Sequence, residues 1–143
     1  MALTDEALRL YNAAEQSVLG ALIADAPMNA ADVFPQVKPE YFITAHYRYI
    51  FETCRKMFAH NDQIDPYTVR AACGTEYIQL VKDLCGMMMT PSNCAAYIRQ
   101  LRDCSIRYRL DALLHETRSH IAYAAPLPEV AALVERMQTV LAS

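Results

Sequence analysis

Two histidines in the last third of the chain have a spacing that invites comparison with a metal site. His115 is followed by Glu116, and the second histidine, His120, comes one residue later than in the HExxH motif of zinc proteases. Residues four apart lie on one face of a helix, whereas residues five apart are separated by about 140°. One helix therefore cannot direct both imidazoles at one ion, and we predict no metal and no cofactor. A small helical metalloenzyme is the catalytic alternative.

Other residues that could act as acids or bases have simpler structural roles. His46 could be a general base, but no nucleophile or acidic partner is identifiable beside it, so a hydrogen-bonded structural histidine is favoured. Asp62 and Asp65 could be paired acids, yet Asp65 directly before Pro66 is typical of a helix N-cap. The sequence has only three glycines and no GxxxxGK[ST] segment to cradle the phosphates of ATP. We predict no catalytic residues in this chain.

Two short runs of residues suit binding better than catalysis. The densest basic run consists of Arg99, Arg102, Arg107 and Arg109. Asp103 and Asp111 interleave with it, and no ladder of aromatic residues accompanies it, so interhelical ion pairs or a solvated face are favoured over contact with DNA. The three methionines at 87–89 cannot all point inward from one helix. Adaptable filling of the core is favoured for them, with an exposed interface as the alternative.

The composition is typical of one soluble domain. A chain of 143 residues can bury about two-thirds of the surface that its unfolded form exposes. The five cysteines are odd in number and lack a CxxC pair, as expected of reduced thiols. A net charge of −3 disfavours duplex nucleic acid as the main ligand. No apolar run approaches the ~18 residues of a membrane span, and the start is acidic, so we expect a cytoplasmic protein without membrane contact.

Apolar residues at helical spacing and the scarcity of glycine predict an all-α fold. The first predicted helix starts at Asn12, which with Glu15 resembles a capping box, and ends before Pro27. A short helix at 30–34 stops at Pro35, and one further turn follows at 39–42. The remaining predicted helices are 45–59 after Thr44, 66–73 after Asp65, 75–86, 94–124 after Ser92 or Asn93, and 128–141.

The longest predicted helix, 94–124, carries apolar residues on opposite faces in its two halves. The first face consists of Cys94, Tyr97, Ile98, Leu101, Cys104 and Tyr108. The second face consists of Ile106, Leu110, Leu113, Leu114, Thr117 and Ile121. At about 100° per residue, the centres of these faces are roughly 170° apart. This helix must therefore bury two different surfaces.

We therefore predict two subdomains. Residues 1–91 form a compact multi-helix head, and residues 92–143 form an antiparallel two-helix hairpin whose first half roofs the head. At ~1.5 Å per residue the last helix spans roughly 20 Å and covers one side of half the longer one, so a hairpin from a second copy would complete a four-helix packing. The residues predicted to form this self-association or partner interface are Ile106, Leu110, Leu113, Leu114, Ile121, Val130, Leu133, Val134, Met137 and Leu141.

Several motifs occur along the chain in a fixed order. They are Ala14-Glu-Gln-Ser-Val-Leu-Gly-Ala-Leu-Ile23, Phe42 with His46, Ile50 and Phe51, Gln63-Ile-Asp-Pro66 with Thr68-Val69, Asn93 followed by Tyr97, and Arg109 with Leu110. In this order, over about residues 12–141, the sequence resembles the N-terminal domain of bacterial replicative DNA helicases of the DnaB type. It departs from the usual pattern where alanines precede Glu15 in place of an acidic residue, and where Asn61-Asp62 replaces a glycine.

The resemblance implies a non-catalytic collar domain of a replicative helicase. In this family the hairpins pair into dimers, and three dimers form a collar on the hexameric helicase. Primase, and in some systems a helicase loader, docks onto that collar. The net charge and the interleaved arginine run of this chain predict only weak or indirect contact with DNA. The ATPase domain is absent from this chain and would lie beyond Ser143. The alternatives are the helicase-binding domain of a primase or loader, and a free-standing protein that binds the helicase.

Overall fold

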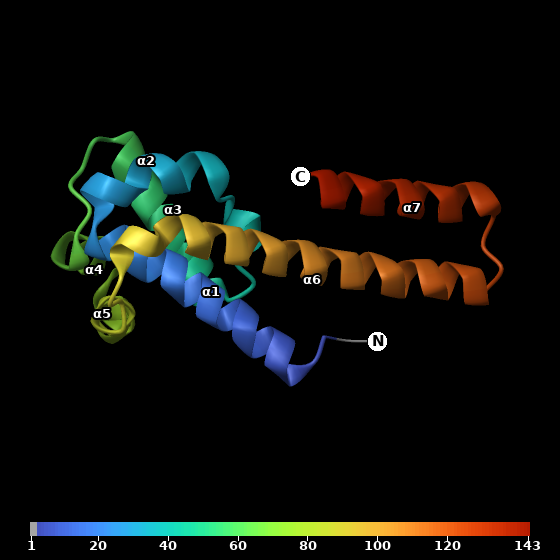
Figure 1. Ribbon diagram of the computed structural model, residues 1–143, viewed down its shortest axis with the longest axis horizontal. Coiled ribbons are helices and arrows are strands. Elements are labelled where there is room, and N and C mark those ends of the chain that lie inside the picture. The colour runs from blue at the N-terminus through green and yellow to red at the C-terminus, as the bar shows by residue number, and fades with distance from the viewer. Residues whose placement is uncertain (1–2) are drawn as a thin grey trace.

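The computed structural model describes residues 3–143, and every regular element within them is helical (Figure 1). The α-helices are α1 (Asp5–Ala24), α2 (Ala26–Gln36), α3 (Ala45–Ala59), α4 (Pro66–Cys73), α5 (Ile78–Gly86), α6 (Cys94–Ala122) and α7 (Leu127–Ala142). Short 3-10 turns, η1 (Pro39–Tyr41), η2 (Thr75–Tyr77) and η3 (Pro91–Asn93), join some of them. The predicted all-α fold class is confirmed.

Helix α1 lies at the centre of the head. It packs against α2, α3, α4, α5 and the first half of α6 (Figure 1). Because helices surround it, α1 buries every residue from Val18 to Ile23, rather than a single stripe. The second half of α6 extends beyond the head, and α7 returns antiparallel to it (Figure 1).

The predicted start of the first helix at Asn12 is wrong. Helix α1 begins at Asp5, and the Thr4 hydroxyl oxygen accepts a hydrogen bond of 3.1 Å from the Ala7 backbone N–H. Glu15 does not take part in a capping box, because its side chain is buried and contacts another element. The start signal that was missed is a threonine followed by two acidic residues, which favour the first turn of a helix.

The second helix is longer than predicted. Helix α2 begins directly after Asp25, and Pro35 lies inside it instead of ending it. A proline inside a helix lacks the N–H that would bond to the carbonyl four residues back. The loss is tolerated here because the helix ends one residue later, and the Val37 N–H still reaches the Val33 oxygen at 2.8 Å.

The capping role predicted for Asp65 is confirmed. Its Oδ1 atom accepts hydrogen bonds from the backbone N–H groups of Tyr67 (2.8 Å) and Thr68 (2.9 Å). In return the Thr68 hydroxyl accepts a bond of 2.9 Å from the Asp65 N–H, which completes a capping box. The bond from the Thr68 N–H, more than any other contact, lowers the pKa of Asp65. This carboxylate therefore has a structural role.

A second carboxyl group, that of Glu15, is fully buried between α1 and the start of α3. Its Oε2 atom accepts a bond of 3.0 Å from the Thr44 N–H, and its Oε1 atom accepts one of 2.9 Å from the Thr44 hydroxyl. Thr44 holds the predicted N-cap position of α3, but its hydroxyl bonds to Glu15 instead of capping the helix. Burial raises the pKa of Glu15, and the bonds from Thr44 oppose that rise.

Helices α1 and α5 approach each other closely at Gly20. A Cβ atom added there would lie 2.8 Å from the Leu84 carbonyl oxygen and 3.3 Å from the end of the Met88 side chain. The methionine can move, but the carbonyl belongs to the backbone of α5. A side chain at this position would therefore push the two helices apart.

We expect Gly20→Ala to lower the free energy of unfolding by about 1 to 3 kcal/mol, because the new methyl group overlaps the α5 backbone. The matched control is Gly86→Ala, since a Cβ atom at Gly86 meets nothing within 4 Å. That control should keep or slightly raise stability. Urea unfolding followed by far-UV circular dichroism measures both, and equal changes in the two variants would refute the close-approach argument.

We expect Glu15→Gln to make stability less dependent on pH. Burial raises the folded-state pKa of Glu15 above its ordinary value of 4.5, so the folded state holds this proton more tightly than the unfolded state. The resulting stabilisation is present below pH 4.5 and is lost as pH rises through the folded-state pKa. Thermal unfolding from about pH 4 to 7 measures this. If the difference in Tm between wild type and variant stays constant over that range, the assignment is wrong.

Candidate self-association surface

Helix α6 is one unbroken helix of 29 residues that serves two parts of the molecule. In its first half Cys94, Ile98 and Leu101 are buried in the core of the head. In its second half Leu113 and Thr117 are buried. At 100° per residue these two buried sets face directions about 110° apart. The change of face that the sequence predicts therefore coincides with the point where α6 leaves the head (Figure 1).

Helices α6 and α7 lie side by side along the hairpin, but their contact buries few side chains completely. Among the residues of α7, all of which the structure describes, Leu133 alone is buried. Full burial of one leucine stabilises by about 1.5 to 3 kcal/mol, and a helix of this length is marginal by itself in water. A further link joins the ends of the hairpin, because the Arg102 Nε atom donates a bond of 3.0 Å to the Ser143 carbonyl oxygen. Helix α7 therefore has little support from this chain alone.

The structure places the predicted interface residues at three levels of burial. Leu113 and Leu133 are buried. The half-buried residues are Ile106, Leu110, Val130 and Met137. The exposed residues are Leu114, Ile121, Val134 and Leu141, with exposed fractions between 44% and 63%. Leu113 and Leu133 are buried where α6 and α7 meet and hold the two helices together. The four exposed residues are not covered by any part of the chain that the structure describes.

The exposed residues lie on one side of the hairpin. Leu114 and Ile121 are rotated by about 80 to 100° from Leu113 on α6. Val134 and Leu141 are rotated by the same amount, in the same sense, from Leu133 on α7. In an antiparallel pair, equal rotations from the facing positions lead to the same side.

Leu127 at the start of α7 extends this side and is 81% exposed. It is absent from the predicted interface because Pro126 and Pro128, on either side of it, indicate only a turn. We call these five residues the apolar flank: Leu114, Ile121, Leu127, Val134 and Leu141.

The opposite side of the hairpin has a different chemical character. A groove of about 390 Å³ runs there between α6 and α7. Its polar lining residues are Tyr108, Arg109, Glu116, Arg136 and Thr139. The Arg109 guanidinium also lies over the Tyr41 ring, 5.6 Å from its centroid, which connects this side to the head. Ala112, Leu113 and Val140 also line this groove, so this side of the hairpin combines charged and apolar groups, whereas the apolar flank presents large apolar side chains. The side with the groove is called the polar side.

The candidate chemical residues of the sequence are dispersed. His115 is exposed, and the Nδ1 atom of His120 lies 2.8 Å from the carbonyl oxygen of Glu116 in its own helix. His46 has the predicted hydrogen bond, at 3.2 Å from the Tyr77 hydroxyl. Within residues 3–143, no three His, Cys, Asp or Glu side chains are grouped as metal ligands. None of the described helices combines the length and the apolar character needed to cross a bilayer.

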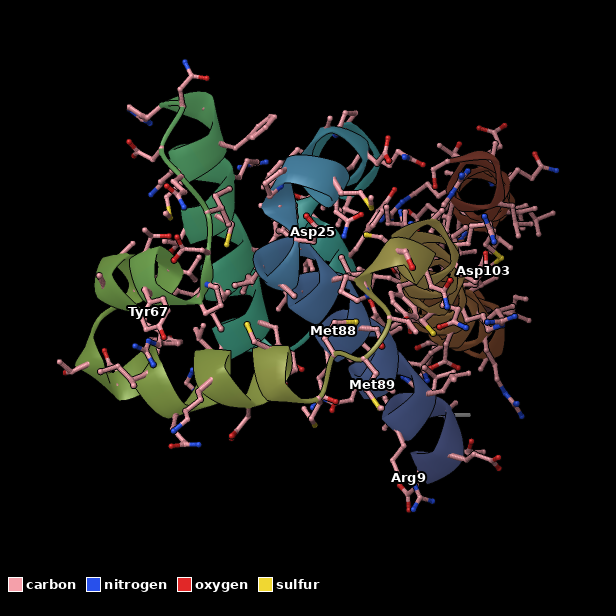
Figure 2. All side chains as sticks on the ribbon, turned by 60° about the vertical axis from the view of Figure 1, so that its left-hand side comes forward. Arg9, Asp25, Tyr67, Met88, Met89 and Asp103 are labelled. Atoms are coloured by element: carbon pink, nitrogen blue, oxygen red, sulfur yellow. The ribbon has the colours of Figure 1, made fainter. Side chains whose placement is uncertain are left out.

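The members of the arginine run differ from one another in exposure, and so do the members of the methionine run. Arg99, Arg102 and Arg107 are exposed, while Arg109 is half-buried. Met88 packs on the core, whereas Met89 is exposed on the connection from α5 to α6 (Figure 2). Met87, directly after α5, is exposed as well. Core filling therefore describes only one of the three methionines.

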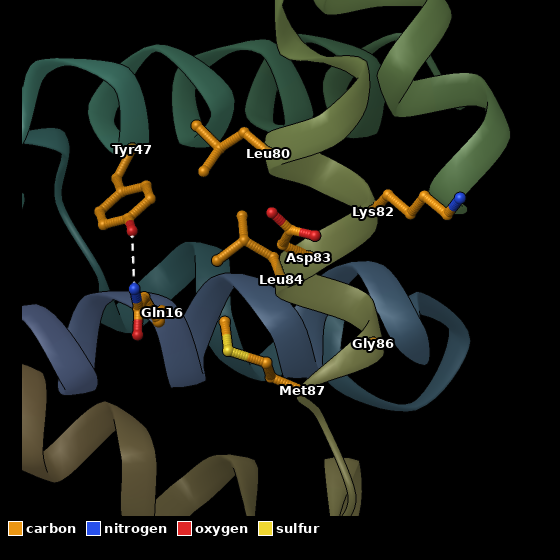
Figure 3. A pocket seen from close by; sticks show the side chains of 8 residues that line it. All are labelled: Gln16, Tyr47, Leu80, Lys82, Asp83, Leu84, Gly86 and Met87. Atoms are coloured by element: carbon orange, nitrogen blue, oxygen red, sulfur yellow. Dashed lines mark hydrogen bonds between the residues drawn. The ribbon is translucent and has the colours of Figure 1, made fainter.

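A pocket of about 460 Å³ lies beside this connection, between α1, α3 and α5 (Figure 3). Gln16 Nε2 donates a bond of 2.8 Å to the Tyr47 hydroxyl on one side of it. Leu80, Leu84 and Met87 supply apolar lining. Asp83, the carboxylate of this pocket, accepts a bond of 2.7 Å from the Gln79 side chain. These groups offer contact surface rather than a reactive arrangement.

The helical head with a projecting antiparallel hairpin agrees with the family that the sequence itself matches. The chain belongs to the DnaB-like helicase N-terminal domain family, whose model matches residues 9–103. The domain is non-catalytic and forms part of a helicase. The family match begins within α1 and ends within α6, so it covers most of the head and about the first third of α6. The resemblance in the sequence is confirmed.

The structure is similar to the crystal structure of the N-terminal domain of DnaB helicase from Mycobacterium tuberculosis. The TM-score is 0.72 at 22% sequence identity, and the match covers 92% of this chain and 96% of that chain. At this identity the similarity establishes the fold. None of the curated proteins compared with the chain matches it.

The turn at the tip of the hairpin holds a non-glycine residue in a left-handed conformation. Ala124 has φ 57°, and the Ala125 N–H bonds to the His120 oxygen at 2.9 Å. The Ala124 N–H bonds to the Ile121 oxygen at 3.2 Å, which completes a Schellman motif. Glycine is usual at this position because a Cβ atom costs roughly 1 kcal/mol in this conformation.

We expect Ala124→Gly to stabilise the hairpin by about 0.5 to 1 kcal/mol, because it removes this conformational cost. The control Ala112→Gly places the same change inside α6, where it should destabilise by about 1 kcal/mol. Amide hydrogen exchange of α7 measures both effects. Faster exchange in Ala124→Gly than in wild type would contradict the assignment of the turn.

Proposed function

We propose that this domain mediates self-association of a replicative helicase through its hairpin. The apolar flank of one hairpin packs on the apolar flank of a second copy, and three such pairs form the collar of the hexamer. Primase or a helicase loader docks on the assembled collar. The observation that carries this proposal is the apolar flank itself, whose five large side chains have exposed fractions of at least 44%.

Two features of the flank favour a second copy as its partner. Both antiparallel helices contribute residues to it, so the same patch on two subunits can face itself across a two-fold axis. The two hairpins then form a four-helix packing, which covers the sides that two helices alone leave open. Helix α7, with Leu133 as its one buried residue, gains the support that this chain does not supply.

The expected strength of the pairing is modest. The two flanks together contribute ten exposed side chains, five from each copy, and burying each one stabilises the pair by about 1 kcal/mol, or roughly 10 kcal/mol in total. The loss of translational and rotational freedom costs about 4 to 15 kcal/mol. These terms are comparable, so the isolated domain should pair in a concentration-dependent way. In a hexameric helicase the other domains hold the copies together and raise their effective concentration.

The polar side of the hairpin remains open in this arrangement. Arg136 and Glu116, both exposed, line its groove and offer charged groups to a partner protein, while the Arg109 guanidinium lies over the Tyr41 ring. We assign primase or loader docking to this side, and only weak or indirect contact to DNA, since the arginines of α6 alternate with acidic residues. The division of the chain into a head (residues 1–91) and a hairpin (residues 92–143) is part of the same proposal. ATP hydrolysis belongs to a separate domain of the helicase.

We expect Leu114→Glu to convert dimers to monomers, because a carboxylate in the middle of the apolar flank would be buried without a partner. Leu113→Glu is a poor test, since Leu113 is buried within the hairpin and its replacement would unfold α7. The control is Ser119→Glu, an exposed position about 140° away on the same helix. Sedimentation equilibrium and circular dichroism measure mass and helicity. Unchanged mass in Leu114→Glu would exclude the flank as the interface.

A further inference from the structure

A groove of about 480 Å³ opens on the head, between the α1–α2 junction and the loop from α3 to α4. Ile23, Ala26, Ala30 and Ile64 are buried beneath it. Phe58 forms an apolar wall and is 43% exposed. The volume falls within the range of about 300 to 1,000 Å³ that is typical of binding pockets. This floor can accept apolar side chains from outside the molecule.

The rim of the groove is acidic. Asp25, Asp62 and Asp65 line it, and none of its lining residues is basic. The pKa of Asp65 is lowered by the bond from the Thr68 N–H, so this carboxylate is charged at neutral pH. Asp25, at the α1–α2 junction (Figure 2), caps α2 through one long bond of 3.4 Å to the Met28 N–H. The rim therefore favours positively charged groups and disfavours phosphates.

The backbone around the groove is fixed by local hydrogen bonds. Asn61 has φ 57°, and the Asp62 N–H bonds to the Met57 oxygen at 2.8 Å, so α3 ends in a Schellman motif with asparagine in the left-handed position. On the other side, the buried Asn29 side chain donates to the Ala21 oxygen at 2.9 Å and to the Pro91 oxygen at 3.0 Å. The groove is thus formed before any ligand arrives, which reduces the cost of binding.

We propose that this groove docks a short segment of a partner protein in which an apolar side chain is flanked by arginine or lysine. The apolar side chain enters beside Phe58, and the cationic groups lie against Asp25 and Asp62. The α1–α2 junction lies at the end of the head remote from the α6–α7 turn (Figure 1), so hairpin pairing leaves the groove open. The inference concerns a different surface and does not rest on the proposed self-association.

The test is a selection of random 12-residue peptides displayed on phage against the purified chain. The selected peptides should combine arginine or lysine with leucine or phenylalanine. When added to isotope-labelled protein, they should shift the amide resonances of Ala24, Phe58 and Ile64. Asp62→Lys should weaken the best peptide at least tenfold at low salt, because it replaces attraction by repulsion. Ala24→Leu should weaken it through loss of space, since Ala24 lines the groove.

Two matched controls use exposed residues of α2 that do not line the groove. Asp32→Lys makes the same charge change, and Ala31→Leu makes the same change in size, so both should keep wild-type affinity. The proposal is overturned if no peptides are enriched, if the enriched peptides are acidic, or if their shifts map to the hairpin. A change of oligomeric state in Asp62→Lys would assign the groove to a second copy and also overturn it.

Discussion

The structure depends on one constraint, which is that α6 must bury two different surfaces along one continuous helix. Its first half closes the core of the head with Ile98 and Leu101, and its second half carries the hairpin. Because the helix is unbroken, the hairpin cannot rotate to bring its exposed leucines onto the head. The apolar flank is therefore held away from its own domain, where a second copy can reach it. Because α6 is rigid, the apolar flank cannot be buried within its own chain, and in this account it forms the interface with a second copy.

The head supplies the fixed base from which α6 projects. Helix α1 is surrounded by its neighbours, and Gly20 lets α5 approach its backbone closely. The buried Glu15 carboxyl joins α1 to the start of α3 through Thr44. The hairpin has much less internal support, since Leu133 is the one buried residue of α7. A well-packed head and a weakly supported hairpin are what an interaction module requires, because the hairpin gains most from a partner.

Local signals in the sequence predicted much of the fold. The cap at Asp65, the bounds of α3 and the change of face along α6 all follow from residue type and helical spacing. The start of α1 has a local signal as well, in Thr4 and the two acidic residues that follow it. The position of Pro35 inside α2 could not be found in this way, because the nearby helix end decides it. The exposure of individual apolar residues also could not be predicted from the sequence. Spacing placed Leu113 and Leu114 on one stripe, but only the path of α7 makes one buried and the other exposed.

The central claim is that the second half of α6 and all of α7 are completed by another copy of the chain. Amide hydrogen exchange measured over a range of protein concentrations tests it most directly. Exchange in the second half of α6 and in α7 should slow as concentration rises, while amides of α1 and of the first half of α6 should exchange at constant rates. Exchange in the hairpin that does not depend on concentration, up to concentrations where the chain is fully soluble, would contradict it.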